Sequence, residues 1–229
     1  VLGLKRSGLS TINFLKKKLK PNSIIGWDDD KKLRSKINQN GFKLRNLKNI
    51  NFKDFSLLIV SPGISTLGPN KHLVIKKAEK NKVDVINDLE LFFRLNQSNN
   101  CIGITGTNGK STTVSLIHHV LNKLKIDNRL GGNIGKPVFD LKIPFNGFYI
   151  LEISSYQLEL MKSSKFKIGI ILNISKDHMD RHNSFKKYIA EKIKIFNNQE
   201  ETDTSILSVD DKYSRNLLNK IKKNRKSEV

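Results

Sequence analysis

The sequence has 229 residues, enough for one large domain or two small ones with a sizeable core. Its 42 lysines and arginines against 21 acidic residues give a net charge of +21, but the lysines are spread along the chain without arginine clusters, which favours solvated faces over specific nucleic-acid binding. A single cysteine excludes an internal disulfide and a Cys-based zinc site, and no apolar run has the length of a membrane span, so we expect a cytoplasmic protein without membrane insertion.

The first predicted unit is the end of a strand, a glycine turn at residues 3–8 and a helix with an apolar period over 9–19. The turn is similar to G-x-G-x-x-G, with Gly3 and Gly8 in place. Lys5 stands where a second glycine would let a pyrophosphate approach closely, so the dinucleotide pattern is incomplete. This departure disfavours an NAD-dependent protein.

A short strand at residues 24–27 is followed by three aspartates. Asp28 stands about where an acidic residue meets a ribose hydroxyl in nucleotide-binding sheets, although an acidic loop or a helix N-cap explains it equally well. The apolar run 57–60 predicts a buried parallel strand, which Ser61 and the following Pro-Gly end in a turn.

A helical pattern at 70–80, a strand at 83–86 and an amphipathic segment at 89–95 complete the first alternation of helices and strands. The polar stretch 96–100 has no periodicity and predicts a domain boundary. We therefore divide the chain into a first domain, 1–96, and a second domain, 97–229.

The second predicted domain restarts with a strand at 101–104, followed by the loop Gly-Thr-Asn-Gly-Lys-Ser-Thr-Thr and a helix over 111–124. The glycines let backbone N–H groups turn inward, Lys110 supplies charge for terminal phosphates, and the Ser111 hydroxyl can hold Mg²⁺. The pattern predicts ATP or GTP with magnesium; a glycine-rich turn with an incidental lysine is the alternative. The residues predicted to bind the nucleotide are Gly106, Thr107, Asn108, Gly109, Lys110, Ser111, Thr112 and Thr113.

Later strands bring more polar groups to the same predicted edge. The glycine-rich turn 131–135 can bring Asn133 close to a ligand. The strand 148–151 ends at Glu152, where P-loop enzymes hold magnesium, although a helix-capping acid is the alternative.

The strand 168–174 leads to His178, the histidine best placed for catalysis. A helix over 184–196, a strand over 205–209 and a basic helical segment from 210 onward complete the predicted elements.

Three motifs are spaced along the chain: the phosphate loop from Gly103, Gly131-Gly-Asn-Ile-Gly, and Asn173 followed by Asp177-His-Met-Asp. Together they resemble the Mur ligases, ATP-dependent amide-forming enzymes of peptidoglycan precursor synthesis. Further runs, Ser61-Pro-Gly-Ile, Asp88-Leu-Glu-Leu-Phe and Leu151-Glu-Ile-Ser-Ser-Tyr-Gln-Leu-Glu, are similar to the member that adds D-glutamate to UDP-N-acetylmuramoyl-L-alanine.

The resemblance covers essentially the whole chain and implies an α/β fold. A Rossmann-like parallel-sheet domain would bind the UDP substrate, and a P-loop ATPase-type central domain, not necessarily complete, would bind ATP. Such enzymes also have a third, carboxy-terminal domain, which nothing in this sequence matches, so we expect a fragment.

The resemblance also assigns roles to single residues. Lys110 would bind the β- and γ-phosphates, and Ser111 and Glu152 the first magnesium ion. Asn133 and His178 would face the acceptor carboxylate and the transferring phosphoryl group, with His178 also reaching a second magnesium. The residues that would line the UDP site are Arg6, Ser7, Asp28, Ser61 and Gly63.

Lys192 matches the lysine that the family carbamylates with CO₂, which turns a cation into an oxygen-donor anion suited to a second Mg²⁺. The implied reaction phosphorylates the L-alanine carboxylate with ATP and lets the D-glutamate amine displace phosphate, in a monomer. The alternatives are another Mur or folylpolyglutamate-type amide ligase, a truncated module that binds UDP-sugar and ATP without turnover, and a nucleic-acid-binding protein.

Overall fold

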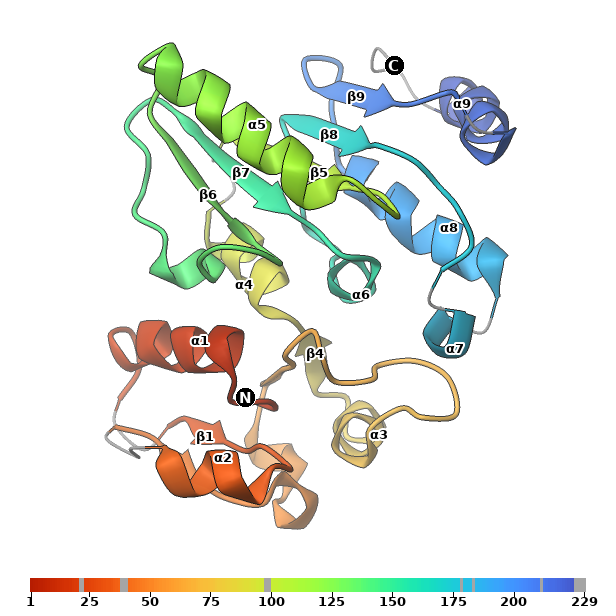
Figure 1. The fold of residues 1–229 in the computed structure, drawn as a ribbon. Helices are drawn as coiled ribbons and strands as arrows, with labels where there is room; N and C mark the ends of the chain where they lie inside the picture. The colour runs from red at the N-terminus through yellow and green to blue at the C-terminus, as the bar shows by residue number, and fades with distance from the viewer. Residues whose placement is uncertain are drawn as a thin grey trace.

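The computed structural model describes residues 1–20, 23–37, 41–96, 100–177, 179–182, 184–210 and 212–224. They form two α/β bodies, one above the other in Figure 1, with α4 between them. The strand pairings in this part of the chain are parallel, which confirms the predicted α/β class. Among the described helices, none has the length and apolar character needed to span a bilayer.

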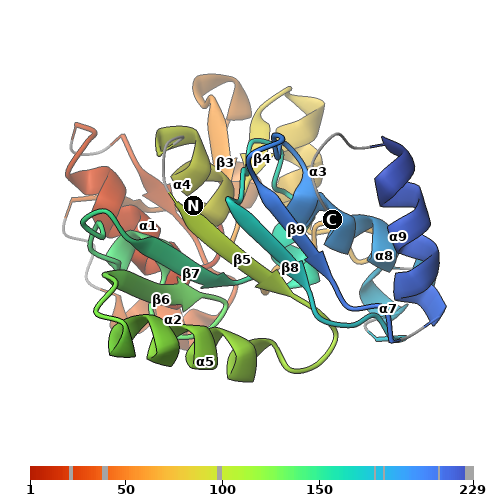
Figure 2. The same cartoon turned by 90° about the horizontal axis from the view of Figure 1, so that it is seen from above.

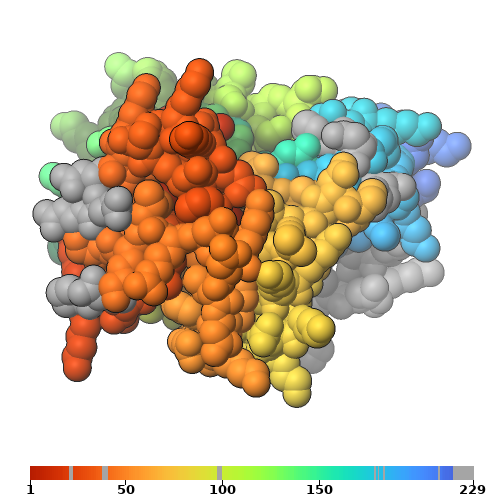
Figure 3. All heavy atoms as spheres, turned by 90° about the horizontal axis from the view of Figure 1, so that it is seen from below, coloured from red at the N-terminus to blue at the C-terminus, as the bar shows by residue number. Residues whose placement is uncertain are grey.

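The N-terminal body alternates short strands with helices. In chain order it contains α1 (Arg6–Lys16), β1 (Ile25–Gly26), α2 (Lys31–Lys36), β2 (Lys43–Leu44), two short 3-10 helices (Leu47–Asn49 and Phe52–Asp54), β3 (Leu57–Ile59), α3 (Leu73–Lys80), β4 (Asp84–Ile86) and α4 (Asp88–Leu95). Seen from below, these elements cover most of the face, and the atoms of the second body show mainly around the rim (Figure 3).

Two strand pairs make up the N-terminal sheet region. β1 pairs with β2 and β3 pairs with β4. The fully buried Leu2 forms parallel bridges to Trp27 and Val60 and so joins the two pairs. β2 was not predicted, because two residues are too few to give a periodic pattern.

Close packing explains the glycines of the first turn. Gly3 has a φ of +90°, and a Cβ at Gly8 would lie 1.8 Å from the Gly3 carbonyl oxygen. A side chain at Gly8 would therefore push α1 away from the strand end that precedes it, and one at Gly3 would strain the backbone and lie 2.7 Å from the Cβ of Ser61.

The central body contains a five-stranded parallel sheet in the order β6-β7-β5-β8-β9. Its elements are β5 (Cys101–Thr105), α5 (Lys110–Lys123), β6 (Asn128–Gly132), the 3-10 helix Val138–Asp140, β7 (Phe148–Glu152), α6 (Ser155–Leu158), β8 (Ile168–Ile171), α7 (Met179–His182), α8 (Phe185–Ile193), the 3-10 helix Lys194–Phe196, β9 (Thr204–Leu207) and α9 (Lys212–Asn224). β6 was predicted only as a glycine turn, because its Asn-Arg-Leu-Gly-Gly sequence has no apolar run.

Helices cover both faces of this sheet, as Figure 2 shows from above. The apolar side of α5, with the fully buried Val114, packs on Ile102, Ile104 and Ile150. On the other face, Phe92 and Phe93 of α4 share a core with Cys101 and Tyr149 of the central sheet. The predicted boundary partly lies outside the described residues, since 97–99 are not described, and the division after residue 96 stays a prediction.

Candidate active site

The predicted phosphate loop connects β5 to α5, at the carboxyl edge of the central sheet. Gly109 caps α5 with a left-handed φ of +81°, which leaves the helix N-terminus open. The side-chain oxygen of Asn173, after β8, accepts hydrogen bonds from the backbone N–H groups of Thr107 (3.0 Å) and Asn108 (2.9 Å), and its amide donates to the Asn108 carbonyl at 3.0 Å. The loop is therefore shaped by its own protein partners. Open backbone amides at a helix N-terminus attract anions such as phosphates.

Lys110 lies back over this loop. Its ammonium donates to the carbonyl oxygens of Gly106 at 2.9 Å and Thr107 at 2.8 Å. Thr113 donates its hydroxyl to the Gly109 carbonyl at 3.0 Å, while Ser111 and Thr112 are exposed on the first turn of α5.

Glu152 ends β7 with a carboxylate that is only 2% exposed. One oxygen accepts a hydrogen bond from the Ser111 hydroxyl at 2.7 Å, and the other accepts one from the Asn133 amide at 2.8 Å. β6 comes close enough to place Asn133 because Gly132 has no side chain: a Cβ there would lie 2.4 Å from the Glu152 carbonyl oxygen. The structure thus brings together three residues that the sequence predicted for catalysis or metal binding.

These donors fit a magnesium ion, which prefers carboxylate and hydroxyl oxygens and keeps several waters. Ser111 and Glu152 supply such oxygens side by side, and among the described residues the buried carboxylate accepts hydrogen bonds from the neutral Ser111 and Asn133 side chains. Within the described ranges, no cluster of three or more His, Cys, Asp or Glu residues is positioned to hold a metal. His178, predicted as a catalytic residue and metal ligand, lies outside the described residues.

Lys192 approaches the same loop from α8 and is 1% exposed. Its ammonium donates to the Gly106 carbonyl at 2.8 Å and lies 4.6 Å from the centre of the Tyr188 ring. Burial, reinforced by the charge of Lys110, lowers the pKa of Lys192 to about 7, although Asp177 acts in the opposite direction. A substantial fraction of Lys192 is therefore a neutral, nucleophilic amine near neutral pH.

Tyr188 and Ser175 also contact the loop, although no motif in the sequence singled them out. The Tyr188 hydroxyl lies 3.0 Å from the Thr107 hydroxyl, which also accepts a hydrogen bond from the Ser175 backbone N–H at 3.0 Å. Both contacts join segments more than 60 residues apart, so spacing along the chain does not predict them.

Two of the five residues predicted for the UDP site, Arg6 and Ser7, line a cavity between the two bodies. This cavity, about 260 Å³, is lined by Lys5, Arg6 and Ser7 from the start of α1 and by Asn133 across from them. Arg6 crosses the gap and donates to the Gly135 carbonyl at 2.6 Å. The structure therefore places two predicted UDP residues and one predicted catalytic residue around one space.

The other three predicted UDP residues do not line this cavity. Asp28 accepts backbone N–H groups from Leu4 (2.7 Å) and Asp30 (2.9 Å), which fixes the glycine turn, and Ser61 donates to the Gly3 carbonyl at 3.0 Å. Gly63 is exposed, with open space where a Cβ would stand. Their roles in UDP binding stay predictions.

A larger cavity, about 740 Å³, lies against β1 and β3 and is lined mainly by apolar side chains such as Leu15, Ile24 and Leu58. None of the predicted site residues lines it. The smaller cavity is instead lined by charged and amide groups, among them Arg6 and Asn133.

Asp88, the first residue of α4, is a further group in the smaller cavity. It is 6% exposed, and its Oδ1 accepts no hydrogen bond from the described residues. Burial raises the pKa of Asp88 to about 6, although the backbone N–H groups of the α4 start favour the charged form. The sequence marked this residue only as part of a family-like run.

Comparisons with known proteins identify the family of the chain. A family model described as the Mur ligase middle domain matches residues 104–229. A protein named UDP-N-acetylmuramoylalanine--D-glutamate ligase from Phenylobacterium zucineum is 36% identical over 228 residues, covering 96% of this chain and 48% of that protein. One of the same name from Caulobacter vibrioides is 39% identical over 229 residues, with 96% and 48% covered. The chain thus spans about half the length of the curated relatives that it matches.

Among solved structures, a UDP-N-acetylmuramate:L-alanyl-gamma-D-glutamyl-meso-diaminopimelate ligase from Neisseria meningitides aligns with 96% of this chain and 74% of its own, with a TM-score of 0.62. At 12% sequence identity, this likeness is one of fold.

Proposed function

The chain belongs to the Mur ligase family, and from this premise we propose that it is an ATP-dependent ligase that adds D-glutamate to UDP-N-acetylmuramoyl-L-alanine in peptidoglycan precursor synthesis. One observation carries the proposal. The phosphate loop, the Ser111–Glu152–Asn133 contacts and the Arg6-lined cavity lie next to one another, so a nucleotide and a second anionic substrate can meet there.

The proposed reaction has two steps. The alanine carboxylate attacks the γ-phosphorus of ATP, forming an acyl phosphate and releasing ADP. The amine of D-glutamate then attacks the acyl carbon, the C–O bond to phosphate breaks, and the amine loses a proton. Activation is required because a carboxylate is a poor electrophile.

The chain's own residues supply charge and orientation. The N-terminus of α5 and Lys110 bind the phosphates and offset the charge that develops on the transferring group. Ser111 and Glu152 would hold Mg²⁺, which supplies further positive charge there. Asn133, fixed by Glu152 at 2.8 Å, orients the acceptor carboxylate, and we assign His178 to the same role.

Lys192 is proposed to react with CO₂ through its neutral amine. The nitrogen lone pair forms the N–C bond, one proton leaves, and the product is an anionic carbamate with two oxygen donors. This group would suit a second magnesium ion better than the ammonium does. The pKa of about 7 supports the proposal, because the amine needs to lose its proton before it attacks.

We also propose a cellular compartment and an oligomeric state for the enzyme. ATP and a nucleotide-activated sugar are cytoplasmic metabolites, so we place the reaction in the cytoplasm. We also propose a monomer that needs no nucleic-acid partner.

The test is ADP release with UDP-N-acetylmuramoyl-L-alanine and D-glutamate, against UDP-N-acetylmuramate with L-alanine and a folate with L-glutamate. Fast ADP release with the first pair alone is the expected result. Faster release with another pair would assign the chain to another ligase of this type.

The second candidate is a module that binds UDP-sugar and ATP without turnover. Calorimetric binding of both ligands, without ADP release for any pair, would support this candidate over the ligase.

A further inference from the structure

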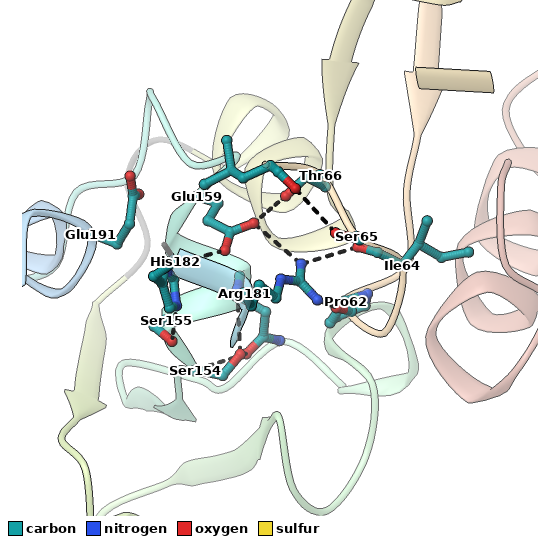
Figure 4. Close-up of polar contacts among 12 residues, drawn as sticks. Pro62, Ile64, Ser65, Thr66, Ser154, Ser155, Glu159, Arg181, His182 and Glu191 are labelled. Atoms are coloured by element: carbon teal, nitrogen blue, oxygen red, sulfur yellow. Dashed lines mark hydrogen bonds and ion pairs between the residues drawn. The ribbon is translucent and has the colours of Figure 1, made fainter. Parts of the chain in front are cut away.

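A buried polar junction joins α7 and the residues after α6 to the turn that follows β3 in the N-terminal body (Figure 4). Its centre is Arg181 of α7, whose side chain is 9% exposed. The guanidinium donates to the Pro62 carbonyl at 3.2 Å and to the Ile64 carbonyl at 3.0 Å. These two carbonyls flank Gly63, so one arginine of the central body fixes the peptide groups around a predicted UDP residue.

Glu159, just after α6, closes the junction with a side chain that is 0% exposed. Its Oε2 accepts a hydrogen bond from Arg181 at 3.2 Å and another from the Thr66 hydroxyl of the N-terminal body. A buried arginine and a buried carboxylate each need the other as a partner, because burying either charge alone is strongly unfavourable. The pair therefore holds the turn 61–66 and α7 in contact.

The junction continues toward the phosphate loop through ring contacts. The Arg181 guanidinium lies 3.8 Å from the centre of the Tyr156 ring, which stacks with His182 at 5.7 Å. His182 in turn meets the edge of Tyr188 at 5.2 Å, and the Tyr188 hydroxyl lies 3.0 Å from that of Thr107. Packed side chains thus connect the turn 61–66 to the nucleotide loop without a break.

His182 is buried, with a polar neighbour beside each of its ring nitrogens. Its Nε2 lies 3.0 Å from the Ser155 hydroxyl, its Nδ1 lies 3.6 Å from Glu159 Oε1, and its ring is fully buried. A shift of Arg181 or Glu159 would therefore move His182, and with it the ring of Tyr188.

We propose that Arg181 is a positioning residue. It couples binding of the UDP substrate at the turn 61–66 to the phosphate loop, through Glu159 and the His182–Tyr188 contacts. The proposal rests on the proposed function, because it needs a UDP substrate and ATP. An arginine suits this role because its planar fork binds two carbonyls and a carboxylate at once, which the single ammonium of a lysine does not reproduce.

The test is calorimetric binding of UDP-N-acetylmuramoyl-L-alanine and a non-hydrolysable ATP analogue with Mg²⁺, each alone and each with the other saturating. In the unsubstituted protein we expect each ligand to tighten the other by about fivefold or more. In Arg181→Ala we expect the analogue alone to bind within about twofold of normal and the mutual tightening to disappear. Arg181→Lys should retain an intermediate effect.

Arg215→Ala is the matched control, because Arg215 also donates to a backbone carbonyl, that of Asp210 at 3.0 Å, but within the central body. It should keep normal coupling. If Arg181→Ala does not fold, Glu159→Gln, which keeps the shape and removes the charge, is expected to reduce coupling in its place.

Two results would overturn the inference: coupling unchanged in Arg181→Ala or Glu159→Gln, or both ligands binding the unsubstituted protein independently. A protein that binds neither ligand would instead contradict the proposed function. The two failures are therefore distinguishable.

Discussion

The phosphate loop and the cavity between the bodies are built in different ways. The loop is held mainly by backbone groups and by Asn173, all at the carboxyl edge of one sheet. The cavity is lined by side chains from α1, the turn after β3, the start of α4 and the end of β6. A loop of the first kind depends on local conformation, whereas a cavity of the second kind depends on how two bodies pack together.

The largest effect is expected from Lys110→Ala, which should impair the phosphate loop and leave the cavity unchanged. Lys110→Ala should slow ADP release by about 10²–10³-fold, because one preorganised charge on the transferring group contributes about 3–4 kcal/mol. The affinity for UDP-N-acetylmuramoyl-L-alanine alone should stay within about twofold, since the hydrogen bonds of Lys110 to the described residues lie within its own loop. Lys123→Ala, at the exposed end of the same helix, is the control. If Lys110→Ala weakened UDP-N-acetylmuramoyl-L-alanine binding as strongly as it slowed ADP release, the two regions would not act independently.

The difference between the regions also explains what the sequence predicted. The strands and helices around the phosphate loop were predicted within a few residues, because continuous apolar runs and a glycine loop are local signals. For example, α5 was expected over 111–124 and spans Lys110–Lys123. β6 was not predicted, because its residues lack such a run.

The contacts across the bodies were not predictable in this way. Arg181 reaches Pro62 over 119 residues and Glu159 reaches Thr66 over 93. Nothing in a local pattern distinguishes these residues from other charged residues of a basic chain. Asp88 is similar: its burial in the cavity follows from the packing of α4 between the bodies.

The cavity has its own expected pH dependence through Asp88. Its pKa rises from 3.8 to about 6 on folding, so between these values the native state holds a proton that the unfolded state releases. The free energy of unfolding therefore falls as the pH rises through this window. Asp88→Asn should stabilise the protein by about 2–3 kcal/mol above pH 6 and by almost nothing below pH 4.

Urea unfolding at pH 4 and pH 7.5 would measure this effect, with the exposed Asp54→Asn as the control for removing one charge. A loss of stability in Asp88→Asn at pH 7.5 would mean that the charged carboxylate is stabilised by a partner in the cavity.

A smaller effect is expected for substitutions of Asn173, whose side chain shapes the phosphate loop. Asn173→Ala removes two acceptor contacts and one donor contact, so we expect a loss of about 1–2 kcal/mol in unfolding free energy and a weaker affinity for the ATP analogue. Asn173→Asp keeps the acceptor for Thr107 and Asn108 and should lose less. If both variants bind the analogue normally, the loop does not depend on Asn173 for its shape.

Arg6→Ala should give the smallest effect. The Arg6 side chain is exposed and crosses the cavity to Gly135, so its removal should change the unfolding free energy by less than about 1 kcal/mol. The affinity for UDP should fall about tenfold if Arg6 binds the pyrophosphate, which is about 1.4 kcal/mol. Arg45→Ala, exposed in the same body, is the control for loss of charge. An unchanged affinity would remove Arg6 from the UDP site.

The acyl phosphate step is tested most directly by following the oxygen atoms of the alanine carboxylate. UDP-N-acetylmuramoyl-L-alanine labelled with ¹⁸O in the alanine carboxylate is incubated with ATP, Mg²⁺ and D-glutamate, and the phosphate is analysed by mass spectrometry. An acyl phosphate formed between the two regions predicts one ¹⁸O atom in the phosphate for each amide bond made. Phosphate without the label, or no amide product, would contradict an acyl phosphate mechanism for this protein.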